Sequence, residues 1–405
     1  MVKCLLIIFF ITCQICFSKN INEYIKESLN DVRFEMFDKK EKVLNEFNSF
    51  KNLIDDVTIE VEKETDNNSN LKYYCKFDFK GISEMHYEGK MNEILLEKCD
   101  SEKLVILSSL LKERYFLIID YLYYRDISIL SDSLLLVYND MIEVEKRNID
   151  KLDFNIENLV KVEEDYEKLR FELIEFDNKL KNSEFVISES LSKSDSIDFR
   201  SNDVISVHEI SKVATDFNLK LINESVIADY IEIKKKEIEV EWEIERAKKN
   251  RILDSFRFGM DKKNNEDVLS FKLGFNIPFL NNRMNDQIKT KIDHLEKLAD
   301  LEYDDSSILE QKNKVFLQLD RYIKQYNLLN EFLDKKSESK IFQYNNVDVF
   351  SLLSIKGSVL KYKMRKVELY RKILQSYIEF IELSKGLASF PLVNYLSHDF
   401  EVLLR

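Results

Sequence analysis

The chain has 405 residues and a formal net charge of −13, with acidic and basic residues mixed along most of its length. This charge argues against a nucleic-acid partner, which would require a basic face. The sequence holds six glycines and two prolines, far below the average usage of about 7% and 5%. Glycine and proline interrupt helices and strands. Their scarcity therefore predicts few turns and long helices or strands.

The first segment in chain order is apolar. Lys3 precedes the run from Cys4 to Phe17, and small residues, Cys16 and Ser18, stand where a signal peptidase looks. We therefore predict a cleaved signal peptide over residues 1–18 and an exported protein. The run is shorter than the about 20 apolar residues of a membrane-spanning helix, which disfavours a permanent anchor. The most apolar later segment, residues 104–124, is interrupted by charges, so any membrane segment must be made of strands.

Charged stretches with few glycine and proline residues predict the helices. At 1.5 Å per residue, a helix of about 60 residues is roughly 90 Å long, more than a compact globule needs. Leucines and other apolar residues at 159–180 and 353–381 follow a seven-residue pattern that indicates packing along a seam. An ordinary helical bundle explains these stripes equally well. The predicted helices are residues 22–54, 90–148, 155–182, 222–251, 282–342 and 347–386.

Two hairpins are predicted by period-two alternation of apolar and polar residues. The first covers residues 56–80, with the polar loop 65–70 between its strands. The second covers residues 253–278 with a turn at 262–267, and Pro278 ends its last strand because proline donates nothing to a ladder. The apolar positions, which we predict to face lipid, are Val57, Ile59, Val61, Tyr73, Phe77, Phe79, Phe256, Phe258, Phe271, Leu273, Phe275 and Ile277.

The same order of features occurs twice: helix, hairpin, long helix, tip, helix. Corresponding features lie between about 191 and 198 residues apart, which predicts an internal duplication. The first repeat covers residues 19–182 with a tip near 150–156, and the second covers residues 208–390 with a tip near 343–348. A linker rich in Ser and Asp, residues 183–207, joins them, and residues 391–405 form a C-terminal tail.

Strands of nine to eleven residues with one apolar face suit an outer-membrane barrel. A sheet with one face on a core and one in solvent gives the same pattern in a single strand. Four strands cannot close a barrel within one chain, and an open edge is forbidden in lipid. The predicted fold class is therefore mainly α with β: duplicated long helical hairpins plus four strands per chain, which form a shared trimeric barrel of 12 strands.

The sequence Phe271-Lys272-Leu273-Gly274-Phe275-Asn276-Ile277-Pro278-Phe279, followed by a charged helix, resembles the TolC family of outer-membrane efflux proteins. In that family an apolar strand ending in Ile-Pro-Leu or Ile-Pro-Phe precedes a long periplasmic helix. The family's helix-turn-helix tip falls on Asn346, Asp348, Ser351, Leu352 and Leu353. The resemblance covers essentially the whole mature chain, although its motifs are loose.

The resemblance implies a homotrimer in outer-membrane lipid that connects to an inner-membrane pump through a periplasmic adaptor. Asn replaces the family's Gly at both tips, which is tolerable because Asn enters positive φ readily. Ser351 stands where an acid is usual. The tip residues that the resemblance assigns to adaptor contact are Asn155, Ile156, Asn346, Val347, Leu352 and Leu353.

No catalytic chemistry is visible in the sequence. Its four histidines are scattered, and there is no P-loop, G-x-S-x-G or Rossmann glycine run. We therefore predict no enzymatic activity, no cofactor and no metal. The net charge predicts an acidic passage that favours cations. Spacing leaves open whether Cys75 and Cys99 pair.

Taken together, the sequence predicts an outer-membrane duct of a tripartite efflux or type I secretion system, with a helical tube in the periplasm. The alternative is a soluble periplasmic helical-hairpin adaptor or a coiled-coil scaffold, in which the two hairpins are small solvent-facing sheets. Fractionation separates the two, because a duct stays with the outer membrane and a scaffold is released.

Overall fold

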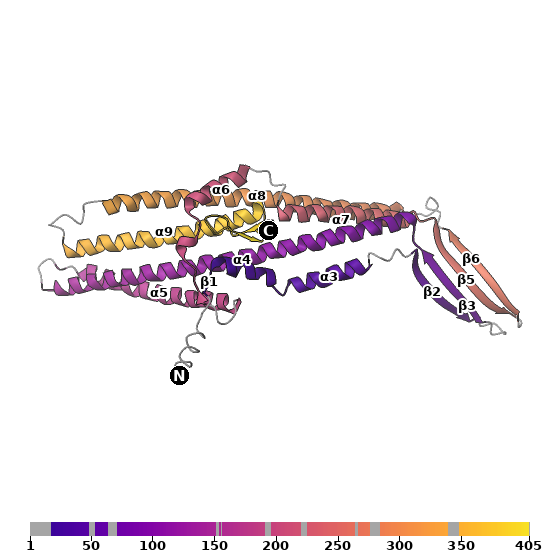
Figure 1. The fold of residues 1–405 in the computed structure, drawn as a ribbon, viewed down its shortest axis with the longest axis horizontal. Helices are drawn as coiled ribbons and strands as arrows, with labels where there is room; N and C mark the ends of the chain where they lie inside the picture. Colours follow the sequence, from indigo (N-terminus) through magenta and orange to yellow (C-terminus); the bar gives the residue numbers. More distant parts are fainter. Residues whose placement is uncertain are drawn as a thin grey trace, which may run out of the picture. The chain divides into compact units, whose positions relative to one another are not determined.

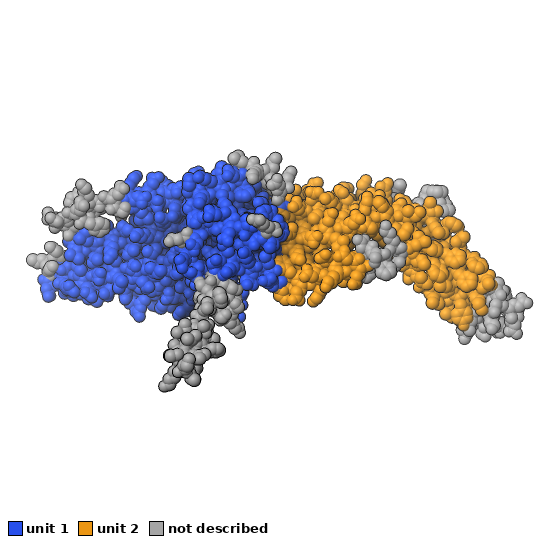
Figure 2. Space-filling view, in the orientation of Figure 1, with its two compact units in different colours: residues 1–31, 105–225, 309–405 blue, residues 32–104, 226–308 orange. Residues whose placement is uncertain are grey.

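The computed structural model describes residues 18–47, 53–63, 71–150, 154, 156–190, 196–219, 225–263, 266–275, 284–338 and 348–404. Its contacts divide the chain into two compact units (Figure 2). Unit 1 comprises Met1–Asp31, Val105–Ser225 and Leu309–Arg405, and unit 2 comprises Val32–Leu104 and Val226–Ile308. The predicted signal peptide, apart from Ser18, lies outside the described residues.

Helices make up most of both units (Figure 1). Among the described helices, none combines the length and the apolarity that crossing a membrane would require. The order α3, β2, β3, α4, α5 recurs later in the chain as α7, β5, β6, α8, α9. The helices are α2 (Ile21–Lys26), η1 (Glu27–Asn30), α3 (Phe34–Phe47), α4 (Ile82–Arg147), α5 (Ile156–Ser190), η2 (Ser201–Asp203), α6 (Val207–Leu219), α7 (Val226–Lys249), α8 (Met284–Glu338) and α9 (Val349–Ser384). The strands are β1 (Ser18–Lys19), β2 (Ile54–Lys63), β3 (Leu71–Phe79), β4 (Ser196–Ile197), β5 (Leu253–Lys263), β6 (Glu266–Phe275), β7 (Leu392–Val393) and β8 (Val402–Leu404).

The first predicted helix, residues 22–54, is divided in the structure. α2 begins after an Asn20 cap, whose side chain accepts from the Glu23 backbone N–H at 3.0 Å. The short helix η1 follows α2, and α3 begins only at Phe34. Tyr24 and Ile25 are buried in unit 1, whereas α3 belongs to unit 2. The predicted helix is therefore interrupted between α2 and α3, at the boundary between the two units.

A short helix, α6, was not predicted. Ser206 and Glu209 form a capping box at its start: the Glu209 carboxylate accepts from the Ser206 backbone N–H at 2.9 Å, and the Ser206 hydroxyl accepts from the Glu209 N–H at 3.3 Å. The Ser206 hydroxyl and N–H, with His398 2.9 Å away, lower the pKa of Glu209 to about 2. The S-x-x-E spacing was therefore the sequence signal for this helix.

The described residues of the segment 183–207, which was expected as a linker, are folded within unit 1. α5 continues to Ser190, and Phe199, Val204 and Ile205 are buried. β4 pairs in parallel with β1. The polar composition of the segment concealed these few buried apolar residues, which pack in unit 1.

Residues 391–404, which belong to the expected C-terminal tail, are also packed. β7 and β8 form a small antiparallel pair, and Leu392 and Leu396 are fully buried. The hydroxyl of Tyr115 donates to the Val393 carbonyl at 3.2 Å and accepts from the Tyr395 N–H at 3.1 Å. These bonds tie the C-terminal segment to α4.

The four long strands form one antiparallel sheet in unit 2, in the order β2-β3-β5-β6 (Figure 1). Each hairpin pairs its own strands, and the two halves of the chain join where β3 pairs with β5. Alternation predicted the strands but not this central pairing, which links residues far apart in the sequence.

Candidate functional site

One face of the sheet is apolar across all four strands. In the register of the sheet, Val57 lies opposite Phe77, which lies opposite Phe256, which lies opposite Leu273. The next row is Ile59, Cys75, Phe258 and Phe271, and the row after it is Val61, Tyr73, Met260 and Leu269. Because side chains alternate along a strand, these twelve residues share one face.

This apolar face is largely exposed. Ile59 is 75% exposed, and Phe271 is 64% exposed. The ring centroids of Phe256 and Phe271 lie 6.3 Å apart, and those of Phe258 and Phe271 lie 5.2 Å apart. Exposed contiguous apolar surface is rare on a soluble monomer and marks a site of interaction.

The structure places nearly all of the sequence-predicted lipid-facing positions on this face or at its end. Phe79 pairs with Ile54, and Phe275 pairs with Leu253, each next to an irregularity in the register. Ile277 and Pro278 lie outside the described residues. Sequence alternation thus identified the residues, but their alignment into one surface required the pairing of the strands.

The opposite face of the sheet is polar and is organised around Tyr74. Its ring is buried, and a Cβ on Gly259 would lie only 2.4 Å from the ring. Glycine is therefore required at 259, because any side chain would displace the ring. The Arg257 guanidinium stacks 3.9 Å from the centroid of Tyr74 and pairs with Glu60.

The end of the sheet that meets the helices carries a buried ion pair. Glu84 is fully buried, and both its carboxylate oxygens accept from Arg251, at 2.8 and 3.0 Å. The same carboxylate accepts from the Gly81 N–H at 3.1 Å. Asp55 lies 3.3 Å from the same guanidinium. The start of α4 and the end of α7 are thereby fixed to the first strand.

The other candidate site is the pair of tips, of which the structure describes only parts. Asn155, Asn346 and Val347 lie outside the described residues. Ile156 begins α5 and is 64% exposed. Asp348 caps α9, because its carboxylate accepts from the Ser351 N–H at 2.9 Å. These hydrogen bonds from Ser351 lower the pKa of Asp348.

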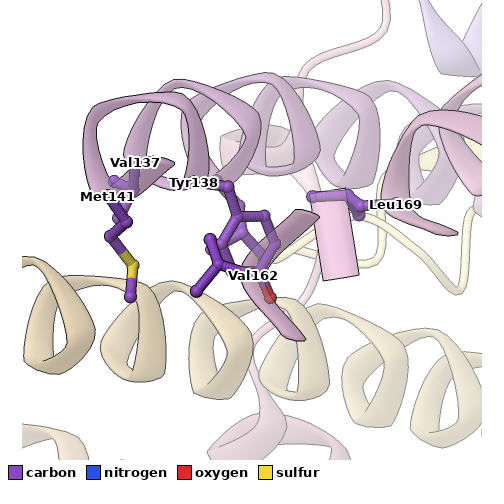
Figure 3. Packing of buried hydrophobic residues seen from close by; sticks show 6 residues of the cluster. Val137, Tyr138, Met141, Val162 and Leu169 are labelled. Carbon is purple, nitrogen blue, oxygen red and sulfur yellow. The ribbon is translucent and has the colours of Figure 1, made fainter. Parts of the chain in front are cut away.

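The helices behind the tips pack around an apolar cluster in unit 1 (Figure 3). α4 contributes Leu134, Val137, Tyr138 and Met141, and α5 contributes Val162 and Leu169. Side chains of α9, including Leu353, pack against the cluster. Leu353 therefore has a packing role within the chain, whereas Leu352 is half-buried outside this cluster.

The described residues hold no group of three or more His, Cys, Asp or Glu side chains that could bind a metal ion. Cys75 lies in β3 and Cys99 in α4, and both are free thiols. The question of their pairing, which spacing left open, is thus answered in this structure by two unpaired cysteines.

No family model matches the sequence, and no curated protein matches it. Several solved structures match the fold. The outer membrane protein VceC of Vibrio cholerae has a TM-score of 0.65 at 10% identity, with 90% of this chain and 96% of that chain covered. The MtrE outer membrane channel of Neisseria gonorrhoeae has a TM-score of 0.64 at 10% identity, covering 94% and 90%.

CusC, described in terms of folding and transmembrane channel formation, has a TM-score of 0.62 at 10% identity, with 90% of this chain and 92% of that chain covered. These matches confirm the predicted mainly helical class with strands. The chain therefore has the fold of the TolC-type outer-membrane channels, and the resemblance found in its sequence holds at the level of fold.

Proposed function

We propose that the chain is an outer-membrane channel whose sheet crosses the membrane with its apolar face toward lipid. The supporting observation is the unbroken apolar face of the four-stranded sheet. The strands have 10, 9, 11 and 10 residues, which matches the about 9–11 residues of a tilted membrane-spanning strand.

Closure of this sheet requires further copies of the chain. β2 and β6 are its outer strands, and each would leave backbone groups unpaired in lipid, at a cost of several kcal/mol per group. The chain supplies an even number of antiparallel strands, so β6 of one copy meets β2 of the next in antiparallel orientation. Both edge strands have 10 residues. Three copies give a barrel of about 12 strands, wide enough for a water-filled interior.

In this proposal the long helices of the three copies continue the passage into the periplasm. The chain would then serve a tripartite efflux or type I secretion system, with a periplasmic adaptor and an inner-membrane pump as partners. The exposed Ile156 and the half-buried Leu352 support adaptor contact at the tips, together with Asn155, Asn346 and Val347 from the sequence pattern.

The alternative, a soluble periplasmic adaptor or scaffold, would leave the apolar sheet face in water. Removing apolar surface from water contributes about 25 cal/mol per Å². A face that carries rings such as Phe271 and Phe258 is therefore unfavourable in water. The apolar face therefore favours the channel.

The proposal is tested by introducing the same charge on either face of β6. Phe271→Lys places a cation on the apolar face, where about 2–4 kcal/mol is lost at the membrane midplane. Ser270→Lys, the neighbouring position, places it on the polar face. After carbonate washing of outer membranes, we expect wild type and Ser270→Lys to be retained and Phe271→Lys to be depleted. Release of the wild-type protein by carbonate, or equal retention of the two variants, would contradict the channel.

A further inference from the structure

Three cations lie side by side on the polar face of the sheet. In the register, Lys76 of β3 is opposite Arg257 of β5, which is opposite Lys272 of β6. Thr58 completes this row on β2. Neighbouring strands are about 4.8 Å apart, so these long side chains can reach one common point above the sheet.

Like charges directly opposite each other destabilise a sheet. The sheet therefore gains no stability from placing three cations side by side in adjacent strands, and two of them have carboxylate partners. Lys76 pairs with Asp78 at 2.9 Å, and Arg257 pairs with Glu60. Lys272 is exposed and takes part in none of the ion pairs found among the described side chains.

The row is held in place by its surroundings. The Arg257 guanidinium stacks on the buried ring of Tyr74, and Gly259 provides the space for that ring. The guanidinium is thus fixed between a carboxylate and an aromatic face, with Lys76 and Lys272 on either side of it. Arg257 is therefore a positioned donor at the centre of the row.

The neighbouring rows on the same face have a different character. One row contains Glu60, Tyr74, Gly259 and Ser270, and the other contains Asp56, Asp78, Ser255 and Gly274. Neither contains a cation. Lys72, four residues from Lys76 along β3, is a further cation on this face, and it lies opposite Glu62 and Asp261. Three cations therefore lie in adjacent strands only in the row of Lys76, Arg257 and Lys272, although the whole chain is acidic.

We infer that Lys76, Arg257 and Lys272 form an oxyanion-binding site on the polar face, for solutes that carry phosphate or carboxylate groups. Lysine and arginine donors suit such oxygens, and arginine adds planar recognition. The inference rests on the proposed function, because the polar face lines the passage only in the shared barrel. Passing anions would then meet this row in each copy.

Inorganic phosphate is the probe, and its binding to the detergent-extracted protein is measured by titration calorimetry. Lys272→Gln removes the exposed cation of the row. Lys72→Gln is the matched control: Lys72 is on the same face but four residues from Lys76 along β3, about 13 Å away. That distance exceeds the Debye length of about 8 Å at physiological salt.

We expect Lys272→Gln to weaken phosphate binding about three- to fivefold, in the range of an exposed charge contact, and Lys72→Gln to weaken it by less than about 1.5-fold. Lys76→Gln should behave like Lys272→Gln. No phosphate binding by the wild-type protein, or equal effects of Lys272→Gln and Lys72→Gln, would overturn the inference. These outcomes are separate from carbonate release, which tests the channel itself.

Discussion

At the level of single residues, the Glu84–Arg251 pair fixes the sheet to its helices. Glu84 is fully buried, and Arg251 contacts both of its carboxylate oxygens. A buried charge that loses its partner is strongly destabilising, because the remaining ion stays out of water. The pair joins the start of α4 to the residues between α7 and β5. These segments are more than 160 residues apart in the sequence, so the pair could not be predicted from spacing.

We therefore expect Glu84→Gln to lower the free energy of unfolding by about 3 kcal/mol. Arg251 would keep only Asp55 as a charged partner among the contacts described above. Glu245→Gln, which breaks an exposed pair with Lys248 on α7, should change it by less than about 0.5 kcal/mol. Urea unfolding of the three proteins in the same detergent measures both differences, and similar losses for the two variants would contradict the role of Glu84.

Gly259 shows what a residue pattern cannot reveal. In the sequence it was simply a polar-face position that alternated with Phe258 and Met260. In the sheet, the ring of Tyr74 occupies the space beside its Cα. The contact depends on pairing between β3 and β5, which brings residues 74 and 259 together.

At the level of elements, local patterns predicted the strands well and the helix boundaries less well. Period-two alternation is a property of the strand itself. The predicted hairpins at 56–80 and 253–278 cover β3, β5 and β6, and also β2 except for its first two residues. The division between α2 and α3 and the packed segment after α5 depend on burial in unit 1. Non-local packing decided these features, and composition alone does not encode it.

The cap of α9 gives a prediction at this scale. Asp348→Ala removes the acceptor for the Ser351 N–H, which should cost the first turn about 1 kcal/mol. Hydrogen exchange of the amides at 350–352 should then be faster by about fivefold at neutral pH. Asp334→Ala, a change of the same chemical kind within α8, should leave those amides unchanged. Equal exchange in Asp348→Ala and wild type would show that the cap contributes nothing.

The same cap has a defined pH dependence. Hydrogen bonds from Ser351 lower the pKa of Asp348 in the folded protein. The cap therefore stabilises the folded state fully above the usual aspartate pKa of about 3.9, and this stabilisation is lost as the pH falls through the lower folded pKa. The difference in exchange between wild type and Asp348→Ala should disappear over that acidic window.

At the level of the whole molecule, the fold is maintained by patterns rather than by particular residues. VceC and MtrE share the fold over 90% or more of this chain at 10% identity. Breaker-poor helices and alternating strands are enough to specify such elements. The positions of the tips were predicted from the resemblance, and three of their six residues lie outside the described part of the chain.

Net charge does not determine the charge of one face of the sheet. The value of −13 predicted an acidic passage, and this stays a prediction. The register of the sheet aligns Lys76, Arg257 and Lys272 in one row. A sum over the chain contains no information on which charges share a face. Strand pairing supplies that information.

The central claim is that several copies close one barrel. The most direct test is the mass of the mature protein extracted in detergent from outer membranes, measured by light scattering with correction for bound detergent. The account predicts a mass near three protomers, from protein found only in that membrane. A monomer recovered from the soluble periplasm would contradict it.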